Sequence, residues 1–209
     1  MLEIEVKLKV ENLKEIQEKL FSIGCQLEKG LYREWNAYYD FPDGRLGKAG
    51  QTLRLRLIGK KAFLTFKGQP QKSRSFKIRE EYETEIKNLK QFKKILKKLG
   101  LKPVFEYRKR RMLLRKGRLK ICLDETAVGN FLELEGRQSD IVRLAKQLGY
   151  SRKNFIKLDY VQMIKGLRGK NHSSSSSSKS SSSSSTSGSS SNSSDSSSNS
   201  SSGSNSSAS

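Results

Sequence analysis

The chain has 209 residues and a formal net charge of +21, which favours a polyanionic partner such as nucleic acid, an anionic membrane or a phosphate-rich small molecule. It contains no apolar run of about 18 residues and no signal-peptide pattern, so we expect a soluble, cytoplasmic protein without a membrane partner. The two cysteines, Cys25 and Cys122, make neither a disulfide framework nor a metal-binding spacing. The single histidine, His172, excludes His-dependent catalytic triads and His-based zinc sites.

The composition divides the chain into two parts. Residues 1–170 contain nearly all the side chains that could be buried, whereas residues 171–209 consist mostly of serine. A segment without large apolar side chains cannot offset the entropy lost on ordering. We therefore predict one folded domain over 1–170 and a disordered, Ser-rich, low-complexity tail over 171–209.

The first predicted element is a strand over residues 2–10, in which apolar and charged residues alternate without exception. Successive side chains of a strand point to opposite faces, so this strand has one apolar and one charged face. A lone strand of this kind would simply turn its charges to water. The same pattern returns in later strands, however, and so many charged faces need a common interior. A sheet closed into a barrel with a charged lumen supplies one.

The remaining chain alternates predicted strands with amphipathic helices. Asn12 can cap a helix that ends at Gly24, and extended chain follows over 26–40. A turn at Pro42-Asp43-Gly44 leads into a short polar link that reaches Gly50. Further strands are predicted at 52–58, 62–67, 79–86, 104–115, 118–124 and 130–136, and further helical segments at 89–99, 139–148 and 160–167. Helices can cover the apolar sides of the strands, which leaves the charged sides for the interior of a barrel.

The charged strand faces fall into two groups. The cations, which can bind phosphate oxygens, are Lys7, Lys9, Arg54, Arg56, Lys67, Lys109 and Arg111. The carboxylates are Glu3, Glu5, Glu81, Glu83, Glu85, Asp124, Glu133 and Glu135. These carboxylates would repel one another unless cations lay between them, and hard divalent ions prefer oxygen ligands. Together the two groups indicate a site for a metal-bound polyphosphate, and the absence of a glycine-rich phosphate loop argues against a P-loop enzyme.

An ordered set of motifs resembles the CYTH domain of the triphosphate tunnel metalloenzymes. The set begins with Glu3-x-Glu5-x-Lys7 and continues with Tyr39-Asp40, Leu53-Arg54-Leu55-Arg56, Leu64-Thr65-Phe66-Lys67-Gly68, Arg79-Glu80-Glu81-Tyr82-Glu83, Lys109-x-Arg111, Leu123-Asp124-Glu125 and 129–136. The resemblance implies an α+β fold: a closed eight-stranded antiparallel β-barrel, or tunnel, with a charged lumen and helices packed on the outside. It also implies that Lys and Arg hold a triphosphate while carboxylates bind Mg²⁺ or Mn²⁺.

On this resemblance we assign three sets of site residues. Predicted catalytic residues are Lys7, Lys9 and Glu83. Predicted substrate-binding residues are Lys7, Lys9, Arg54, Arg56, Lys67, Lys109 and Arg111. Predicted metal ligands are Glu3, Glu5, Glu81, Glu83, Asp124, Glu133 and Glu135.

The overall sequence is most similar to bacterial and archaeal proteins of the class IV adenylate cyclase type. Asn36 departs from the Asp that many cyclase-like members carry before Tyr-x-Asp. Our leading hypothesis is therefore a metal-dependent hydrolase of inorganic triphosphate or of a small organic triphosphate such as thiamine triphosphate. The alternative is a class IV adenylate cyclase, which converts ATP to cyclic AMP and pyrophosphate.

A third hypothesis is a non-catalytic binder of polyphosphate or RNA. The acidic strands argue against it, because a pure polyanion binder has no use for carboxylates in its groove. We expect a triphosphate-containing small molecule as the partner, disfavour nucleic acid, and leave open a homodimer.

Overall fold

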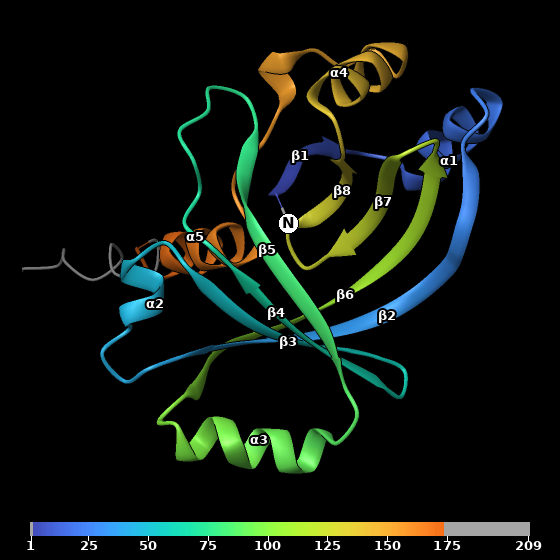
Figure 1. Cartoon of the computed structure of the whole chain (residues 1–209). Coiled ribbons are helices and arrows are strands. Elements are labelled where there is room, and N and C mark those ends of the chain that lie inside the picture. Colours follow the sequence, from blue (N-terminus) through green and yellow to red (C-terminus); the bar gives the residue numbers. More distant parts are fainter. Residues whose placement is uncertain (1, 174–209) are drawn as a thin grey trace, which may run out of the picture.

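Eight antiparallel strands close into a barrel in a computed structural model of the chain, which describes residues 2–173 and the side chains of residues 2–167. The strand order around the barrel is β1-β5-β4-β3-β2-β6-β7-β8 (Figure 1). The strands are β1 (Leu2–Val10), β2 (Gln26–Asp40), β3 (Thr52–Ile58), β4 (Lys61–Lys67), β5 (Lys77–Ile86), β6 (Lys102–Lys116), β7 (Leu119–Thr126) and β8 (Gly129–Glu135). The predicted fold class and the eight-stranded antiparallel barrel are confirmed.

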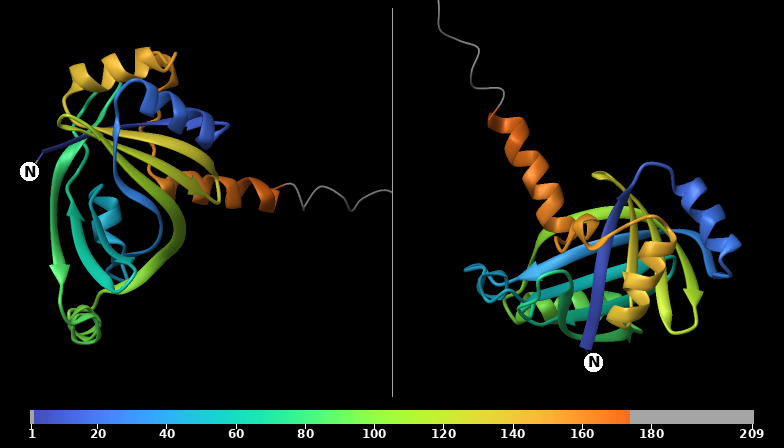
Figure 2. Two further views of the ribbon diagram at one scale, coloured as in Figure 1. Left: turned by 90° about the vertical axis from the view of Figure 1, so that its right-hand side faces the viewer. Right: turned by 90° about the horizontal axis from the view of Figure 1, so that it is seen from above.

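The helices lie outside the barrel, as Figures 1 and 2 show from three directions. They are α1 (Leu13–Ser22), α2 (Arg45–Lys48), α3 (Leu89–Lys98), α4 (Gln138–Gln147) and α5 (Tyr160–Ser173), with a 3-10 turn at Arg152–Asn154. Asn12 caps α1 as predicted, since its side-chain oxygen accepts hydrogen bonds from the backbone N–H groups of Lys14 and Glu15. Within the part of the chain that the structure describes, none of the helices could cross a membrane.

Most predicted element bounds differ from the structure by a few residues, and one short helix was not predicted. The link after the turn at Asp43 contains α2, because the Asp40 carboxylate accepts hydrogen bonds from the backbone N–H groups of Leu46 and Gly47 and so fixes a helical turn there. Strand β5 begins at Lys77 rather than at residue 79. Helix α5 continues to Ser173, beyond the segment predicted over 160–167, and residues 174–209 of the predicted tail lie outside the described residues.

The apolar core lies outside the barrel wall, between the sheet and its helices. The outward side chains Val6 and Leu8 of β1 are fully buried and belong to one cluster with Leu20 of α1 and Ile141 of α4. A second cluster joins the other side of the sheet to Leu96 of α3. Because helices cover the apolar strand faces, the opposite faces point into the lumen, and these carry the charged side chains.

Candidate active site

Two chambers flank a narrow waist: the first lies within the barrel, and the second lies at its end, beside the loop at 68–76 and α5. The first, which we call the charged chamber, has a volume of about 440 Å³ and is lined by charged side chains apart from Tyr82. The waist is a cavity of about 30 Å³ that shares Arg54, Lys67 and Arg111 with the charged chamber. The second chamber, which we call the rear cavity, measures about 490 Å³ and shares Tyr38 and Arg79 with the waist.

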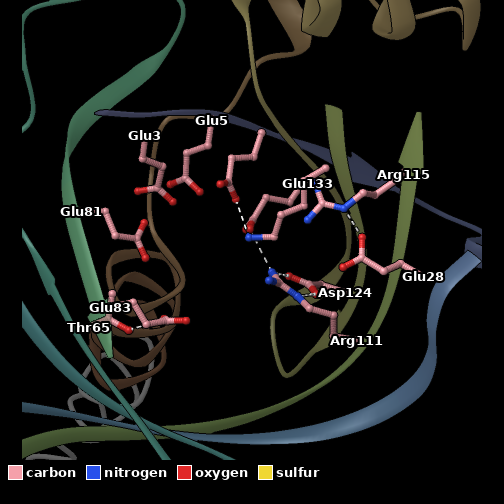
Figure 3. A network of polar contacts seen from close by, with 12 residues as sticks. Glu3, Glu5, Glu28, Thr65, Glu81, Glu83, Arg111, Arg115, Asp124 and Glu133 are labelled. Atoms are coloured by element: carbon pink, nitrogen blue, oxygen red, sulfur yellow. Dashed lines mark hydrogen bonds and ion pairs between the residues drawn. The ribbon is translucent and has the colours of Figure 1, made fainter. Parts of the chain in front are cut away.

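Strands β1, β4 and β5 meet at the wall of the charged chamber through a shared lysine. Figure 3 shows Glu3 and Glu5 of β1 and Glu81 of β5 pointing into the lumen. The Lys67 ammonium of β4 lies 2.8 Å from both carboxylate oxygens of Glu3 and 2.9 Å from Glu81 Oε2. One cation thus bridges two carboxylates from different strands. The register explains this, since Lys67 pairs with Glu81 and Glu3 pairs with Arg79 across neighbouring strands.

A second ion cluster joins β6, β7 and β8. The Arg111 guanidinium donates to both oxygens of Asp124 at 2.6 Å and to Glu133 at 2.9 Å, as Figure 3 also shows. Asp124 further accepts from Lys109 at 3.0 Å and from the Tyr160 hydroxyl of α5 at 2.7 Å. The Asp124 oxygens are therefore already bound by three donors, and this carboxylate acts as the counter-ion of the cluster.

Strand β3 contributes two arginines, one tightly paired with a carboxylate and the other only loosely paired. Arg56 donates to both oxygens of Glu83 at 2.7 Å. Arg54 donates to Thr65 Oγ1 at 3.2 Å, and its ion-pair distances to Glu83 and Glu81 are 3.7 and 4.0 Å. Among the described residues, the buried Nε of Arg54 has no hydrogen-bond partner. Arg54 lines both the charged chamber and the waist, so its guanidinium has donors left for a bound ligand.

Opposite charges keep the lumen ionised despite its burial. Burial alone would raise the pKa of the Glu5 carboxyl, but the field of Lys7 outweighs it and the pKa is lowered. Burial likewise opposes the charged form of Lys7, yet Glu133 and Glu5 raise the pKa of its ammonium. The Glu133 carboxyl has a pKa well below its ordinary value, since Lys7 and Arg111 outweigh the effect of its burial. These groups are therefore charged at neutral pH.

The carboxylates of the lumen fit a hard divalent cation by their chemistry. As they stand, no three His, Cys, Asp or Glu side chains among the described residues are gathered closely enough to hold a metal ion. The ammonium of Lys67, however, already occupies the place of a shared cation between Glu3 and Glu81. Carboxylate oxygens are the ligands that Mg²⁺ and Mn²⁺ prefer. The donor set is thus suitable, provided that Lys67 releases one of its carboxylates.

Some predicted site residues lie apart from these clusters. The side chain of Lys9 is exposed, and it lines neither the charged chamber nor the waist. Glu135 lines the charged chamber but is held by Lys120 at 2.7 Å. Glu85 pairs with Lys61 at 3.4 Å, and both side chains are largely exposed.

Several lumen residues were missed from the sequence. Glu34 is 1% exposed, with its carboxylate 3.6 Å from Lys109 and 3.8 Å from Arg56. Burial would raise the pKa of Glu34, but Lys109, Arg111 and Arg56 lower it to about 2. The neighbouring inward residue, Asn36, is fully buried, and its amide has no hydrogen-bond partner within residues 2–167. The extended run over 26–40 was visible in the sequence, but its inward face was not, because polar and aromatic residues occupy both faces of the segment.

The other missed residues lie at the waist or, for Lys77, in the adjoining wall of the rear cavity. Arg79 Nε lies 3.4 Å from Glu3, and Lys77 pairs with Asp159 at 3.3 Å. Burial and the neighbouring Lys7 lower the pKa of the Lys77 ammonium to about 8. The ammonium groups of Lys7 and Lys109 lie 5.3 Å and 5.0 Å from the centroid of the Tyr160 ring, which is the geometry of a cation–π contact. The first turn of α5 therefore closes on the waist from outside the barrel wall.

Comparisons with known proteins agree with this architecture. A protein of Methanocaldococcus jannaschii, provisionally named an adenylate cyclase, is 30% identical over 78% of this chain and 98% of its own length. A crystal structure from Vibrio parahaemolyticus, also provisionally named an adenylate cyclase, has a TM-score of 0.70 and 22% identity and covers 79% of this chain and 98% of its own. A Pyrococcus horikoshii protein gives a TM-score of 0.63 with 25% identity over 79% of this chain and 99% of its own.

A structure from Hippeastrum is described with a second activity. The protein from Hippeastrum is described as an adenylyl cyclase by provisional name with a dominant triphosphatase activity, and matches with a TM-score of 0.57 and 16% identity over 79% of this chain and 95% of its own. That similarity concerns the fold alone. The family model of the CYTH domain matches residues 1–158, which span the whole barrel. The chain therefore belongs to the CYTH domain family.

Proposed function

We propose that this protein hydrolyses a small triphosphate in the lumen of the barrel with the help of Mg²⁺ or Mn²⁺. The CYTH family consists of metal-dependent tunnel enzymes that act on triphosphates. The observation that carries the proposal is the charge balance of the lumen. The cations that line the charged chamber and the waist are Lys7, Arg54, Arg56, Lys67, Arg79, Lys109, Arg111 and Lys120. The carboxylates that line the same two cavities are nearly equal in number, namely Glu3, Glu5, Glu81, Glu83, Glu133, Glu135 and Asp159. Two further buried carboxylates, Glu34 and Asp124, pair with Lys109 of this set.

A balanced lumen cannot neutralise a triphosphate by itself. Each cation that turns to a phosphate oxygen leaves a carboxylate without its partner, and an unpaired buried charge is costly. A divalent cation that arrives with the triphosphate replaces the lost partner. Lys67 illustrates the exchange, because its ammonium can pass from Glu3 and Glu81 to a phosphate, and the two carboxylates then become available to a metal ion.

The proposed roles follow from where each side chain lies. Phosphate oxygens would be held by Arg54, Arg56, Lys67, Lys109 and Arg111. A metal ion would be held by Glu3, Glu5 and Glu81. Glu83, Glu133 and Glu135, which also line the charged chamber, are further carboxylates within it. When bound, the metal supplies charge neutralisation and activation of water. Lys7 and Glu83 face the lumen and remain candidates for direct catalytic roles, while the exposed Lys9 does not enter the proposal.

Cyclisation of ATP is the second candidate function. It is supported by the cyclase names of the Methanocaldococcus and Vibrio relatives. Hydrolysis is supported by the charged chamber, which presents ionic groups and offers Tyr82 alone as an uncharged lining side chain. The Hippeastrum protein, which shares the fold, is described as having a dominant triphosphatase activity. A cytoplasmic location and a homodimer stay predictions.

Identification of the products separates the two reactions. The purified full chain is incubated with Mg²⁺ or Mn²⁺ and with tripolyphosphate, thiamine triphosphate or ATP, and the products are resolved by ion-exchange chromatography. We expect release of inorganic phosphate, and no turnover in excess EDTA or in the Glu5→Gln variant. Cyclic AMP and pyrophosphate as the main products from ATP would favour the cyclase. Full turnover in EDTA would contradict any metal-dependent proposal.

A further inference from the structure

The excess positive charge of the chain lies outside the lumen. The cations that line the charged chamber and the waist are matched by a similar number of carboxylates, so the lumen is close to neutral. In the Ser-rich segment over 171–209, the charges of Lys179 and Asp195 cancel. The net charge of +21 is therefore carried by the outer surface of the folded domain.

Helix α3 and its flanks concentrate this charge. Figure 1 shows α3 on the outside of the barrel, at the lower edge of the molecule, with no other element beyond it. Residues 86–105 contain seven lysines and no Asp or Glu. All seven are exposed, and in the described part of the chain none forms an ion pair with a carboxylate. They are Lys87, Lys90, Lys93, Lys94, Lys97, Lys98 and Lys102.

Helices α1 and α4, on the opposite side of the barrel in Figure 1, balance their charges instead. In α1, Lys19 pairs with Glu15 at 2.6 Å, and in α4, Arg143 pairs with Asp140 at 2.6 Å. Like charges four residues apart on a helix repel each other. Helix α3 has three such pairs, which are Lys90 with Lys94, Lys93 with Lys97, and Lys94 with Lys98. An external anion can relieve this repulsion.

The outward surface of α3 also has an apolar edge. Leu96 is buried against the sheet, and Leu89 and Phe92 pack beside it. Ile95 and Leu99, in contrast, are 53% and 62% exposed. Positions four residues apart lie on the same side of a helix, so the two side chains form one exposed aliphatic edge beside the lysines.

A lysine-rich helix with an exposed aliphatic edge has the chemistry of a contact with an anionic membrane surface. Clusters of about four to eight basic residues on an amphipathic helix are typical of binding to anionic headgroups. Exposed aliphatic side chains can enter the boundary between headgroups and acyl chains. Nucleic-acid sites typically add arginines and stacking aromatic side chains. Residues 86–105 contain no arginine, and Phe92 and Phe105 are turned into the protein.

We propose that α3 attaches the protein to an anionic phospholipid surface, with its lysines on the headgroups and with Ile95 and Leu99 at the boundary with the acyl chains. The expectation of no membrane partner rested on the lack of a membrane-spanning run, which a surface contact does not need. Among the described residues, those that line the charged chamber and the waist all lie outside 86–105. The inference is therefore independent of the proposed function.

Vesicle binding by the full chain tests the proposal. Purified protein is mixed with vesicles of phosphatidylcholine alone or of phosphatidylcholine with about one third phosphatidylserine, and bound protein is measured by flotation. We expect binding to the anionic vesicles to be at least about tenfold tighter, and to weaken as salt is raised, because the lysines are exposed. Equal binding to both vesicles, or binding to neither, would overturn the proposal.

Matched substitutions assign the contact to α3. Lys94→Gln combined with Lys98→Gln removes two exposed charges from α3 and should weaken binding to the anionic vesicles about tenfold or more. Lys14→Gln combined with Lys19→Gln removes two exposed charges from α1 as the control, and should weaken binding less than about twofold. Equal losses in the two variants would show that the net charge of the whole chain attracts the vesicles, and would overturn the proposal.

The apolar edge separates a membrane from a nucleic acid. Ile95→Ser combined with Leu99→Ser should weaken vesicle binding about tenfold, because the aliphatic contact with the acyl boundary is lost, and should leave binding to a single-stranded RNA unchanged. Wild-type vesicle affinity in this variant would overturn the proposal. So would RNA binding by the wild type that persists at a salt concentration that releases the protein from the vesicles.

A fluorescent reporter keeps the test valid if the aliphatic variant does not fold. Gln91 is exposed on the outward side of α3, so Gln91→Trp places an indole at the proposed contact. Phe21→Trp places one on α1, where Phe21 is 41% exposed. We expect anionic vesicles to shift the emission of Gln91→Trp to shorter wavelength and to leave that of Phe21→Trp unchanged. A shift in Phe21→Trp alone, or in neither variant although protein is bound, would place the contact elsewhere and overturn the proposal.

Discussion

In the middle of strand β1 both faces are buried, but they are stabilised in opposite ways. On the outer face, Val6 and Leu8 are fully buried, and on the inner face Glu5 and Lys7 are each 3% exposed. Burial of an aliphatic side chain stabilises the fold by roughly 1.5–3 kcal/mol. Burial of a charge costs free energy that only well-placed partners can offset. The outer shell therefore supports the barrel, and the lumen is a set of charges that the shell holds in place.

The comparison also explains why the lumen suits a ligand that carries charge. The outer shell has fixed contacts with no alternative partners. In the lumen, each cation holds carboxylates that could instead bind a metal ion. Lys67, which lies between Glu3 and Glu81, is an example. Changes in the outer shell should therefore affect stability alone, whereas changes in the lumen should affect stability, activity or both according to how many partners they leave unpaired.

The largest effect on stability is expected from two neighbouring arginines of β6 that face opposite ways. Arg111→Met leaves Asp124 and Glu133 without their guanidinium, and should lower the free energy of unfolding by roughly 3–5 kcal/mol. Arg110 points outward and pairs with Glu125 at 3.1 Å on the surface, so Arg110→Met should cost less than about 1 kcal/mol. Urea denaturation of both variants measures the difference. Equal losses would show that the lumen pair is no more important than a surface pair.

The next effect concerns the outer shell alone. Leu8→Ala removes a fully buried side chain from the cluster beneath α1 and α4, and should lower the free energy of unfolding by roughly 2–5 kcal/mol. Its side chain points away from the lumen, so KM for the substrate should stay the same. Denaturation and steady-state kinetics on one preparation test both statements. A changed KM without a loss of stability would contradict the division between the two faces.

A smaller, pH-dependent effect is expected from Glu34. Its pKa is about 2 in the folded protein against an ordinary value of 4.5, because Lys109, Arg111 and Arg56 outweigh its burial. A lowered pKa contributes stability that is present above the unfolded pKa and is lost as the pH falls from about 4.5 toward 2, here on the order of 3 kcal/mol. Glu34→Gln should remove this contribution, so its stability should fall less steeply than that of the wild type across the window. Parallel curves would refute the assignment.

The alternation of β1, together with its return in later strands, was enough to predict a barrel with a charged lumen, because a period-two pattern shows which face each side chain takes. The number of strands came from the resemblance to the CYTH domain. The same pattern does not state how far along the barrel a side chain lies. Lys9 shares the inward face of Glu5 and Lys7, yet it stands at the end of the strand and is exposed. Lys67 of β4, in contrast, lies where β1 and β5 bring two carboxylates together. Depth in the tunnel depends on the stagger of neighbouring strands, which a single sequence does not show.

The missed residues had weak or absent local signals. Lys77 and Arg79 belong to a run with charges on both faces, so alternation could not identify the inward side. Glu34 and Asn36 lie in a segment where Trp35 is the outward neighbour, and no polar period was apparent there. Tyr160 comes from a helix that follows the barrel, and only its tertiary contact with Asp124 assigns it to the lumen. Asp159 and Tyr160 could therefore be found only from the structure.

The central claim is that lumen cations bind the triphosphate while the outer shell maintains the fold, and Arg54→Met tests it most directly. Arg54 lines both the charged chamber and the waist, and its ion-pair distances of 3.7 and 4.0 Å leave it loosely held by the protein. We expect kcat/KM for the preferred triphosphate to fall roughly 10- to 100-fold, since a charge-assisted contact contributes about 1.5–3 kcal/mol. The free energy of unfolding should stay within about 1 kcal/mol of the wild type, because Glu81 keeps Lys67 and Glu83 keeps Arg56 as partners, so no buried carboxylate is left unpaired. Unchanged kcat/KM, or a loss of activity fully accounted for by unfolding, would contradict the account.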